Sequence, residues 1–331
     1  MKKILLIGGE GYIGNVIANY FLKEKFNVIS YDNLLYNNRI CVDQKLHYSN
    51  YKFINGDLNN KLLLDNTIQD VDFIILLAGL VGDPITKKYP EESSLINDQG
   101  IIKVINMCAD LNVERFVFIS TCSNYGLIKS ENMANENHKL NPLSLYAKSK
   151  VNAENYILSL KGQTKMHPTI LRFSTAFGLS PRMRFDLTIN EFTRELVLGN
   201  ELSVYDAHTW RPYCHVNDFA KLIHLVLDAP SNKVSFEVFN SGDERNNATK
   251  KTIIELIRKK VSSGKIIFSD KGDDARNYRV NFSKVKSILG FKSEFSITDG
   301  IMEVIQAINN NEFINIESNK NFYGNYEINY K

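Results

Sequence analysis

The stretch KILLIGGEGYIG, residues 3–14, runs from an apolar segment directly into a cluster of glycines. The apolar part, residues 4–7, is too short for the hydrophobic core of a signal peptide and predicts a buried β-strand. Gly8, Gly11 and Gly14 follow with the spacing G-x-x-G-x-x-G, and a helical pattern covers residues 13–25. Glycines between a strand and a helix permit a tight turn and let a pyrophosphate approach the helix N-terminus. The stretch therefore predicts a dinucleotide-binding unit.

Short apolar runs alternate with longer amphipathic stretches through the first half of the chain. The predicted strands cover residues 3–7, 27–31, 52–54, 72–77, 115–120 and 169–173, and the predicted helices cover 13–25, 58–69, 94–111 and 145–160. This alternation predicts βαβ units. Because such crossovers are right-handed, an α/β fold with a doubly wound parallel sheet is the simplest topology.

The pattern changes after residue 173, where helices at 187–198 and 216–227 and a strand at 236–240 are predicted. We assign residues 1–175 to a nucleotide-binding domain, with returning segments at about 209–228 and 236–241. Residues 176–208 and 242–310 are assigned to a smaller C-terminal α/β lobe that binds the substrate. Residues 311–331 are rich in asparagine and tyrosine and are predicted to be a loosely packed tail.

The composition excludes several classes of protein. Hydrophobic residues make up 44% of the 331 residues and charged residues 23%, as in soluble globular proteins. The net charge of +3 is too small to attract nucleic acid. The sequence has no run of about 18 apolar residues, so no membrane span is predicted. The four scattered cysteines and six histidines lack metal-ligand spacing, so we expect no metal and a reducing, cytoplasmic setting.

Asp32 ends the second predicted strand. A carboxylate at this position accepts hydrogen bonds from the adenosine ribose hydroxyls and repels a 2′-phosphate, so NAD is favoured over NADP as the cofactor. The alternative is a plain glycine turn followed by a surface aspartate.

Tyr146 and Lys150 lie four residues apart in a predicted helix and therefore share one face. An ammonium beside a phenol lowers the pKa of the phenol, and a phenolate can remove a hydroxyl proton while hydride leaves the same carbon. Thr121 follows a predicted buried strand, at the sheet edge where ligands bind, and could hydrogen-bond the oxygen being oxidised. Ser123 is the rival for that role.

These motifs resemble an extended short-chain dehydrogenase/reductase of the NAD-dependent epimerase/dehydratase type, over roughly residues 2–310. The resemblance also includes Gly56-Asp57-Leu58, Leu77-Ala78-Gly79 and the segment 210–216. It implies a Rossmann sheet, a nucleotide-diphosphate sugar as substrate, and a homodimer that pairs the long helices 94–111 and 145–160. It also implies that Thr121 is the catalytic hydroxyl.

The same resemblance assigns further residues to the cofactor. Asp57 and Leu58 would contact adenine, and Leu77, Ala78 and Gly79 would lie beside the nicotinamide ribose, with Gly79 in place of the usual alanine. Asn97 would organise backbone or water, unless it is a helix-surface residue. The other residues assigned to the cofactor are Tyr12, Ile13, Asn33, Ser120, Phe173 and the catalytic pair Tyr146 and Lys150.

The substrate residues include four arginines, because arginine forks suit a diphosphate. Arg211 and Arg276 match the diphosphate arginines of the family, while Arg182 and Arg184 flank a loop that leaves the sheet; surface charge is the alternative for each. Asn190 is a candidate phosphate ligand. The other residues assigned to the substrate are Val81, Gly82, Thr121, Ser123, Ser174 and Thr175. His215, Cys122 and Trp210 are interpreted as structural residues.

Residues 80–84 and 177–187 resemble a bacterial subgroup that includes GDP-heptose 4-dehydrogenases of surface-polysaccharide pathways. The resemblance implies oxidation of a sugar hydroxyl by NAD⁺, usually at C4, by a 4-epimerase or a 4-dehydrogenase/reductase. A 4,6-dehydratase needs an acidic pair after the threonine, and Cys122 and Ser123 cannot supply it. The alternative class is a catalytically silent NAD-binding sensor or scaffold, against which the intact catalytic set argues.

Overall fold

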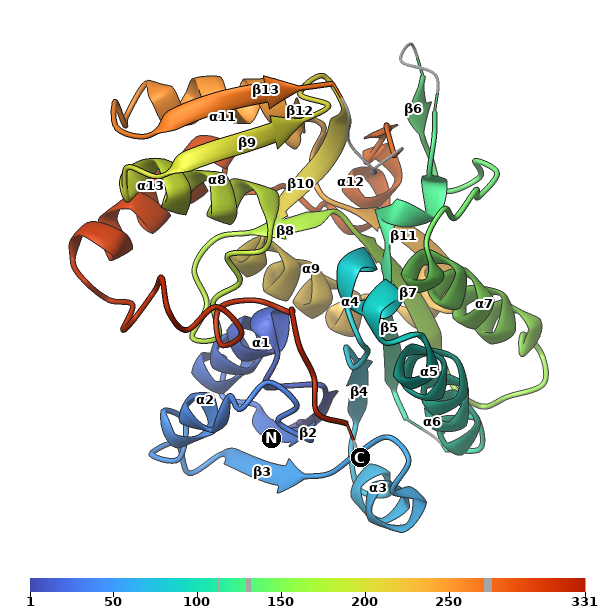
Figure 1. Ribbon diagram of the computed structural model, residues 1–331. Coiled ribbons are helices and arrows are strands. Elements are labelled where there is room, and N and C mark those ends of the chain that lie inside the picture. The colour runs from blue at the N-terminus through green and yellow to red at the C-terminus, as the bar shows by residue number, and fades with distance from the viewer. Residues whose placement is uncertain (112, 129–131, 271–275, 331) are drawn as a thin grey trace.

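The structure is a computed structural model that describes residues 1–111, 113–128, 132–270 and 276–330. Its largest element is a seven-stranded sheet in the order β11-β7-β5-β4-β1-β2-β3, in which every pair is parallel (Figure 1). The strands are β1 (Lys3–Ile7), β2 (Asn27–Asp32), β3 (Tyr51–Asn55), β4 (Phe73–Leu76), β5 (Arg115–Thr121), β7 (Pro168–Phe173) and β11 (Glu237–Ser241). The chain winds outward from β1 in both directions, which confirms the doubly wound parallel sheet and places its switch point between β1 and β4.

Both faces of this sheet are covered by helices. α1 (Tyr12–Lys23) and α9 (Val216–Asp228) contribute to the core on one face, and α3 (Lys61–Ile68), α6 (Ile101–Ala109) and α7 (Leu145–Ser159) contribute to the core on the other. Within β1, Ile4 and Leu6 join the first core, whereas Leu5 and Ile7 join the second. The uninterrupted apolar run of β1 is therefore explained by burial on both sides.

The predicted helix 94–111 is a composite of three pieces. α5 (Pro90–Ser93) leads into a π-helical turn, η1 (Ser94–Gly100), which continues as α6. The predicted helix 58–69 begins later, at Lys61, because the Asn60 side chain caps it by accepting a hydrogen bond from the Leu63 backbone. Shorter elements of the same half are α2 (Arg39–Asp43), α4 (Asp83–Lys88), η2 (Cys122–Tyr125) and β6 (Met133–Ala134).

The second half of the chain forms smaller sheets beside the large one (Figure 1). β8 (Thr175–Phe177), β10 (Trp210–His215) and β12 (Asn247–Thr249) form one sheet, and β9 (Glu201–Tyr205) pairs with β13 (Lys265–Ser269). The helices of this half are α8 (Thr188–Val197), α10 (Ser231–Val234), α11 (Lys250–Arg258), α12 (Ser283–Leu289) and α13 (Ile297–Asn309), with η3 (Glu244–Asn246) and β14 (Arg279–Val280) between them. β11 returns to the large sheet, whereas β10 does not; the division into two domains stays a prediction.

The prediction of a loosely packed tail is contradicted only in part: residues 317–320 are exposed, whereas the segment around Tyr323 is packed. Tyr323 is only 6% exposed, its ring packs beside Phe185 and Phe313, and its carbonyl accepts a 2.7 Å hydrogen bond from the Phe185 backbone. The tail, dark red in Figure 1, passes α1 and ends beside α3. The tail was predicted to be loose because asparagine and tyrosine are polar. A tyrosine ring, however, buries apolar area while its hydroxyl forms hydrogen bonds. No helix in the described part of the chain is long and apolar enough to cross a membrane.

Candidate active site

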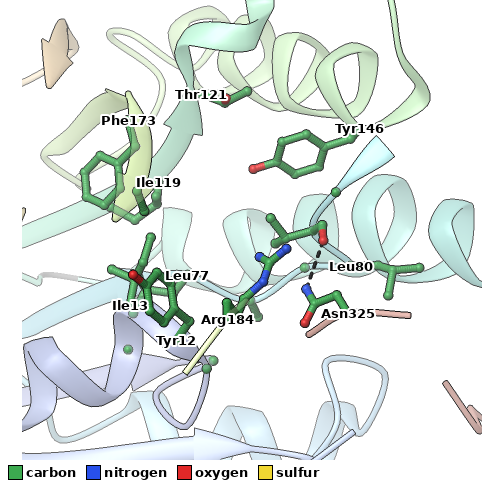
Figure 2. A pocket seen from close by; sticks show the side chains of 18 of the residues that line it. Tyr12, Ile13, Leu77, Leu80, Ile119, Thr121, Tyr146, Phe173, Arg184 and Asn325 are labelled. Atoms are coloured by element: carbon green, nitrogen blue, oxygen red, sulfur yellow. Dashed lines mark hydrogen bonds between the residues drawn. The ribbon is translucent and has the colours of Figure 1, made fainter. Parts of the chain in front are cut away.

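A pocket lies at the carboxyl ends of the central strands, where the topology predicts a ligand. Its wall contains Gly8 after β1, Asp32 at the end of β2, Ala78 after β4, Thr121 at the end of β5 and Phe173 at the end of β7. Figure 2 shows this pocket from close by. Five different strands therefore converge on one cavity.

The three motif glycines are needed for two different reasons. Gly8 has a φ of 89°, and a Cβ there would lie 2.6 Å from the Ala78 nitrogen; a Cβ on Gly14 would lie 2.5 Å from the Gly8 oxygen. A Cβ on Gly11 would meet only the Gly8 oxygen, at 3.6 Å, although Gly11 lines the pocket. The chain itself requires Gly8 and Gly14, whereas the bare backbone of Gly11 leaves room for a ligand. No side chain caps α1 at Gly11, so its N-terminus fits a pyrophosphate.

Asp32 is fixed by the backbone around it. Its Oδ2 accepts a hydrogen bond from the Glu10 nitrogen at 2.9 Å, and its Oδ1 accepts one from the Leu34 nitrogen at 2.8 Å. Burial raises the pKa of Asp32 to about 6, and these two hydrogen bonds oppose the shift. Farther along the pocket, Asn33 donates to Asp57 Oδ2 at 2.8 Å. The pocket thus holds two preoriented carboxylates at the end where the adenosine is expected.

The predicted catalytic residues come together at this pocket. Ser144 caps α7 by accepting a hydrogen bond from the Ala147 nitrogen, which fixes the first turn of the helix and with it Tyr146. Lys150 Nζ lies 5.8 Å from the centre of the Tyr146 ring and donates to the Ile119 carbonyl at 2.8 Å. In Figure 2 the Tyr146 ring points into the pocket, with Thr121 on the neighbouring wall.

The expectation that Lys150 lowers the pKa of Tyr146 is corrected by the structure. Burial raises the pKa of the Tyr146 phenol above its usual value; the Asp83 carboxylate raises it further, and Arg184 opposes the shift. Burial lowers the pKa of Lys150 to about 7. The group that titrates near neutrality in the protein alone is therefore the lysine rather than the tyrosine.

The residues after Thr121 face different surroundings. Thr121 Oγ1 accepts a hydrogen bond from the Ser123 nitrogen at 3.1 Å, and the Ser123 hydroxyl lies 3.4 Å from Arg276 Nη1. Both residues line the pocket, so either can meet a substrate oxygen. Cys122 instead points into the protein, where its thiol donates to the Arg172 carbonyl.

Three of the four predicted arginines are held on the substrate side by defined contacts. Arg184 makes a bidentate ion pair with Asp186, at 2.9 and 2.5 Å, and Arg276 pairs with Asp83 at 2.8 Å. The guanidinium of Arg211 lies 5.2 Å from the centre of the Tyr278 ring. All three line the pocket.

Arg182 lines the pocket between the segment after β2 and the C-terminal tail, where its Nη2 donates to the Gly324 carbonyl at 3.1 Å. Its guanidinium is 4.3 Å from the centre of the Tyr36 ring, in the segment after β2, and it lowers the pKa of Asp32. The side chain is 2% exposed and makes no ion pair with any residue that the structure describes, and its Nε has no hydrogen-bond partner among them. Burial lowers the pKa of Arg182 to about 10. Burial of this cation favours an anionic ligand group in the pocket, and Arg182 lies within electrostatic reach of both Asp32 and Asp186.

Two predicted ligand residues do not reach the pocket. Asn97 is 1% exposed, and its amide bonds the Leu80 nitrogen and carbonyl, so it holds the loop after β4 instead of the cofactor. Asn190 is fully buried and bonds the Gly178 nitrogen, the Tyr12 hydroxyl and the Arg184 carbonyl, so no donor is left for a phosphate. The contacts of Asn97 agree with its expected role as an organiser of the backbone, whereas Asn190 is corrected from a phosphate ligand to an internal support. Every other residue assigned to the cofactor or the substrate lines the pocket.

The structural interpretations of His215 and Trp210 agree with their contacts. His215 Nδ1 accepts a hydrogen bond from the Asn217 nitrogen, and its Nε2 lies 2.6 Å from Glu303 Oε1. Trp210 packs under the guanidinium of Arg279 and does not line the pocket. Pocket residues that the sequence reasoning missed are Tyr36, Asn38, Asp83, Asp186, Glu191, Lys250, Tyr278, Asn325 and Tyr326. Of these, Asp83 and Asp186 lay in segments singled out by sequence, 80–84 and 177–187.

Comparison with known proteins agrees with this geometry. The model of the NAD dependent epimerase/dehydratase family matches residues 4–242. The putative UDP-glucose 4-epimerase of Methanocaldococcus jannaschii is 26% identical over 316 residues, covering 93% of this chain and 99% of that protein. The UDP-glucose 4-epimerase of Lactobacillus helveticus is 25% identical, covering 91% and 94%.

Two solved structures share the fold. The dTDP-glucose 4,6-dehydratase of Bacillus anthracis, in complex with NAD, has a TM-score of 0.83 at 25% identity and covers 94% of this chain and 98% of its own. The UDP-glucuronic acid 4-epimerase of Bacillus cereus, in complex with UDP-glucuronic acid and NAD, has a TM-score of 0.81 at 23% identity, with 93% and 99% covered. The chain therefore belongs to the NAD-dependent epimerase/dehydratase family of sugar-nucleotide-modifying enzymes, whose cofactor is NAD.

Proposed function

We propose that this protein oxidises a hydroxyl of a nucleotide-diphosphate sugar at C4, as a 4-epimerase or a 4-dehydrogenase/reductase, in the synthesis of surface-polysaccharide sugars. The observation that carries the proposal is the convergence of Thr121, Tyr146 and Lys150 on a pocket that also contains the glycine turn and Asp32. The proposed base Tyr146, the Thr121 hydroxyl and the proposed dinucleotide site thus share one cavity.

The cofactor end of the pocket is assigned by its polar groups. The turn through Gly8, Gly11 and Gly14 and the uncapped start of α1 would hold the pyrophosphate, together with Arg182. Asp32 would accept from the adenosine ribose, and Asp57 and Leu58 would contact adenine. When bound, NAD⁺ accepts the hydride that leaves the sugar carbon.

The protein's own part in the reaction is to move one proton. Tyr146 would act as a phenolate: its Oη would take the proton of the sugar hydroxyl as the hydride passes from the same carbon to NAD⁺, while Thr121 Oγ1 hydrogen-bonds that oxygen. Because burial raises the pKa of the phenol in the protein alone, the phenolate requires the ammonium form of Lys150 and the positive charge of the bound NAD⁺ beside it. Lys150 is positioned by the Ile119 carbonyl, and its ammonium form stabilises negative charge on the phenol. Because the pKa of Lys150 is about 7, the charge of this pair changes near neutral pH.

The residues after Thr121 argue against dehydration. Elimination of water across C5 and C6 requires an acid and a base beside the sugar, and Cys122 and Ser123 provide neither a carboxylic acid nor a carboxylate. Cys122 also faces the protein interior. The nearby Asp83 carboxylate is engaged by Arg276. These contacts favour a reaction that ends with the ketone or with its reduction.

A homodimer remains part of the proposal. The outer surface of the helical pair formed by η1, α6 and α7 exposes Leu95 and Leu145. Burial of such apolar side chains against a second copy would be favourable. Light scattering of the purified protein, with Leu145→Glu as the variant, tests this interface: a dimer that the variant dissociates supports it, and a monomeric parent contradicts it.

Product analysis tests the reaction. The purified protein is incubated with NAD and, in turn, UDP-glucose, UDP-glucuronic acid, GDP-mannose and dTDP-glucose, and the products are identified by nuclear magnetic resonance. A C4 epimer or a 4-keto sugar, absent with Tyr146→Phe, supports the proposal. A 4-keto-6-deoxy sugar contradicts it, and no turnover of any nucleotide sugar favours a silent NAD-binding protein.

A further inference from the structure

The C-terminal tail crosses the pocket and contributes residues to its wall. Asn325 and Tyr326 line the cavity, and Asn325 is only 7% exposed. The neighbouring Gly324 carbonyl accepts a hydrogen bond from Arg182 at 3.1 Å. Figure 2 shows Asn325 close to Arg184, on the substrate side of the pocket. The tail is thus part of the site, although it lies outside both segments assigned to substrate binding by sequence.

Asn325 joins two parts of the substrate wall. Its Nδ2 donates to the Val81 carbonyl at 2.9 Å, the interaction drawn as a dashed line in Figure 2. Its backbone N–H donates to Asp186 Oδ2 at 3.3 Å, and Asp186 is the bidentate partner of Arg184. The loop after β4 and the Arg184–Asp186 pair are therefore both tied to this one residue.

The other end of the Asn325 amide is unsatisfied. Oδ1 is buried and has no hydrogen-bond partner among the described residues. The orientation of the amide is set by the Val81 carbonyl, which requires the nitrogen on its side. A buried acceptor without a partner costs about 1–3 kcal/mol, so such groups are uncommon unless a ligand or water completes them. Asn325 lines the pocket, so a ligand hydroxyl can supply the missing donor once a small shift of the side chain turns Oδ1 toward the cavity.

The position of Asn325 favours the substrate over the cofactor as that ligand. Leu77, Ala78 and Gly79 follow β4 directly and are the residues proposed beside the nicotinamide ribose. Val81, which Asn325 holds, lies two residues beyond Gly79 along the same loop. Arg184, tied to Asn325 through Asp186, is close enough to Tyr146 to lower its pKa. The free acceptor is thus near the place where a sugar must lie to reach Tyr146.

We propose that Asn325 is a substrate-binding residue whose Oδ1 accepts a hydrogen bond from a hydroxyl of the sugar, while its Nδ2 and backbone N–H position the Val81 loop and Arg184. This inference rests on the proposed function, because it takes a nucleotide sugar as the ligand. It adds to that function a sugar contact supplied by the tail.

Paired titrations test this role without any measurement of turnover. Isothermal calorimetry compares UDP-glucose with UDP, GDP-mannose with GDP, and dTDP-glucose with dTDP, in the parent protein and in Asn325→Ala. Loss of one hydrogen bond should weaken binding of the nucleotide sugar about 3- to 10-fold. Binding of the free diphosphate and of NAD should be unchanged, since neither carries the sugar. Asn325→Leu, which keeps the branched shape and the number of heavy atoms of the side chain, should show the same selective loss.

Two other tail asparagines serve as matched controls. Asn319 has an exposed side chain, so Asn319→Ala should not change the affinity for any of these ligands. Asn321 Oδ1 accepts from the Tyr326 and Glu327 nitrogens, so Asn321→Ala loosens the tail without removing a pocket atom. If Asn325→Ala weakens binding of the diphosphate as much as binding of the nucleotide sugar, the inference is overturned. It is also overturned if neither affinity changes. In both cases the proposed function stands. A parent protein that binds no nucleotide sugar overturns both.

Discussion

The two walls of the pocket are built in different ways. On the cofactor wall, Gly8, Asp32 and Phe173 each end or directly follow a strand of the large sheet. On the substrate wall, residues are held by side-chain bonds between distant segments, such as Asn325 to the Val81 carbonyl and Arg276 to Asp83. The first wall is specified by local sequence, whereas the second exists only after the whole chain has folded. Changes at four sites test whether the two walls are independent.

The largest effect is expected in the glycine turn. Gly14→Ala places a methyl group 2.5 Å from the Gly8 oxygen, so the turn must shift and NAD affinity should fall about 100-fold or more. The methyl group of Gly11→Ala has room within the protein, so the thermal midpoint of the NAD-free variant should not change. The variant should lose only affinity for NAD. Calorimetry and thermal unfolding measure both. Normal NAD binding by Gly14→Ala would refute the steric argument.

Arg182→Met should weaken NAD by about 10- to 100-fold, because a charge-assisted contact to phosphate is lost. The NAD-free protein should lose little stability, since the buried Arg182 forms no ion pair with a described residue and its hydrogen bond to the Gly324 carbonyl is the polar contact that is lost. Arg194, whose charge is paired with Glu195, provides the matched control Arg194→Met, which should leave NAD binding unchanged. If Arg182→Met binds NAD normally but loses affinity for nucleoside diphosphates, Arg182 belongs to the substrate wall after all.

Asp32 should make NAD binding depend on pH. Its pKa is raised to about 6, so the carboxylate that accepts from the ribose is ionised above this pH and becomes protonated below it. NAD affinity should therefore fall as the pH falls through about 6, and it should be about tenfold weaker at pH 5 than at neutral pH. Calorimetry across this range measures the effect. Asp32→Asn should bind weakly at every pH, and a parent protein with a flat profile would contradict the role of Asp32.

The smallest effect on NAD is expected from the support of the substrate wall. Glu303 Oε1 accepts from the Leu179 nitrogen at 2.8 Å and lies 2.6 Å from His215 Nε2. Glu303→Ala should lower the free energy of unfolding by about 1–2 kcal/mol, because two polar groups lose their partner. NAD affinity should not change. Urea denaturation measures the free energy of unfolding, and a parallel titration measures the NAD affinity. A large loss of NAD binding would mean that the walls are not independent.

The cofactor wall was largely predictable. Strand–turn–helix order, the glycine spacing and the four-residue separation of Tyr146 and Lys150 are local patterns, and a parallel sheet brings its strand ends to one edge. The bounds of α3 and the π-helical turn at residues 94–100 were not predictable, because side-chain capping and helix packing decide them.

The substrate wall was predictable only in part. Asn190 and Asn325 are the same residue type in polar surroundings, yet Asn190 is hydrogen-bonded inside the protein, whereas Asn325 lines the pocket and has a buried oxygen without a partner among the described residues. The difference depends on partners more than a hundred residues away in the case of Asn325. The pKa of Tyr146 was mispredicted for a related reason, since burial outweighs the neighbouring lysine.

The central claim is that Tyr146 accepts the proton while hydride passes to NAD⁺. NAD-loaded protein is mixed rapidly with the nucleotide sugar that the product analysis identifies, and the absorbance of NADH is followed. The account predicts that Tyr146→Phe binds NAD as the parent does but forms NADH at least about 100-fold more slowly. NADH formation at the parental rate by Tyr146→Phe would contradict it.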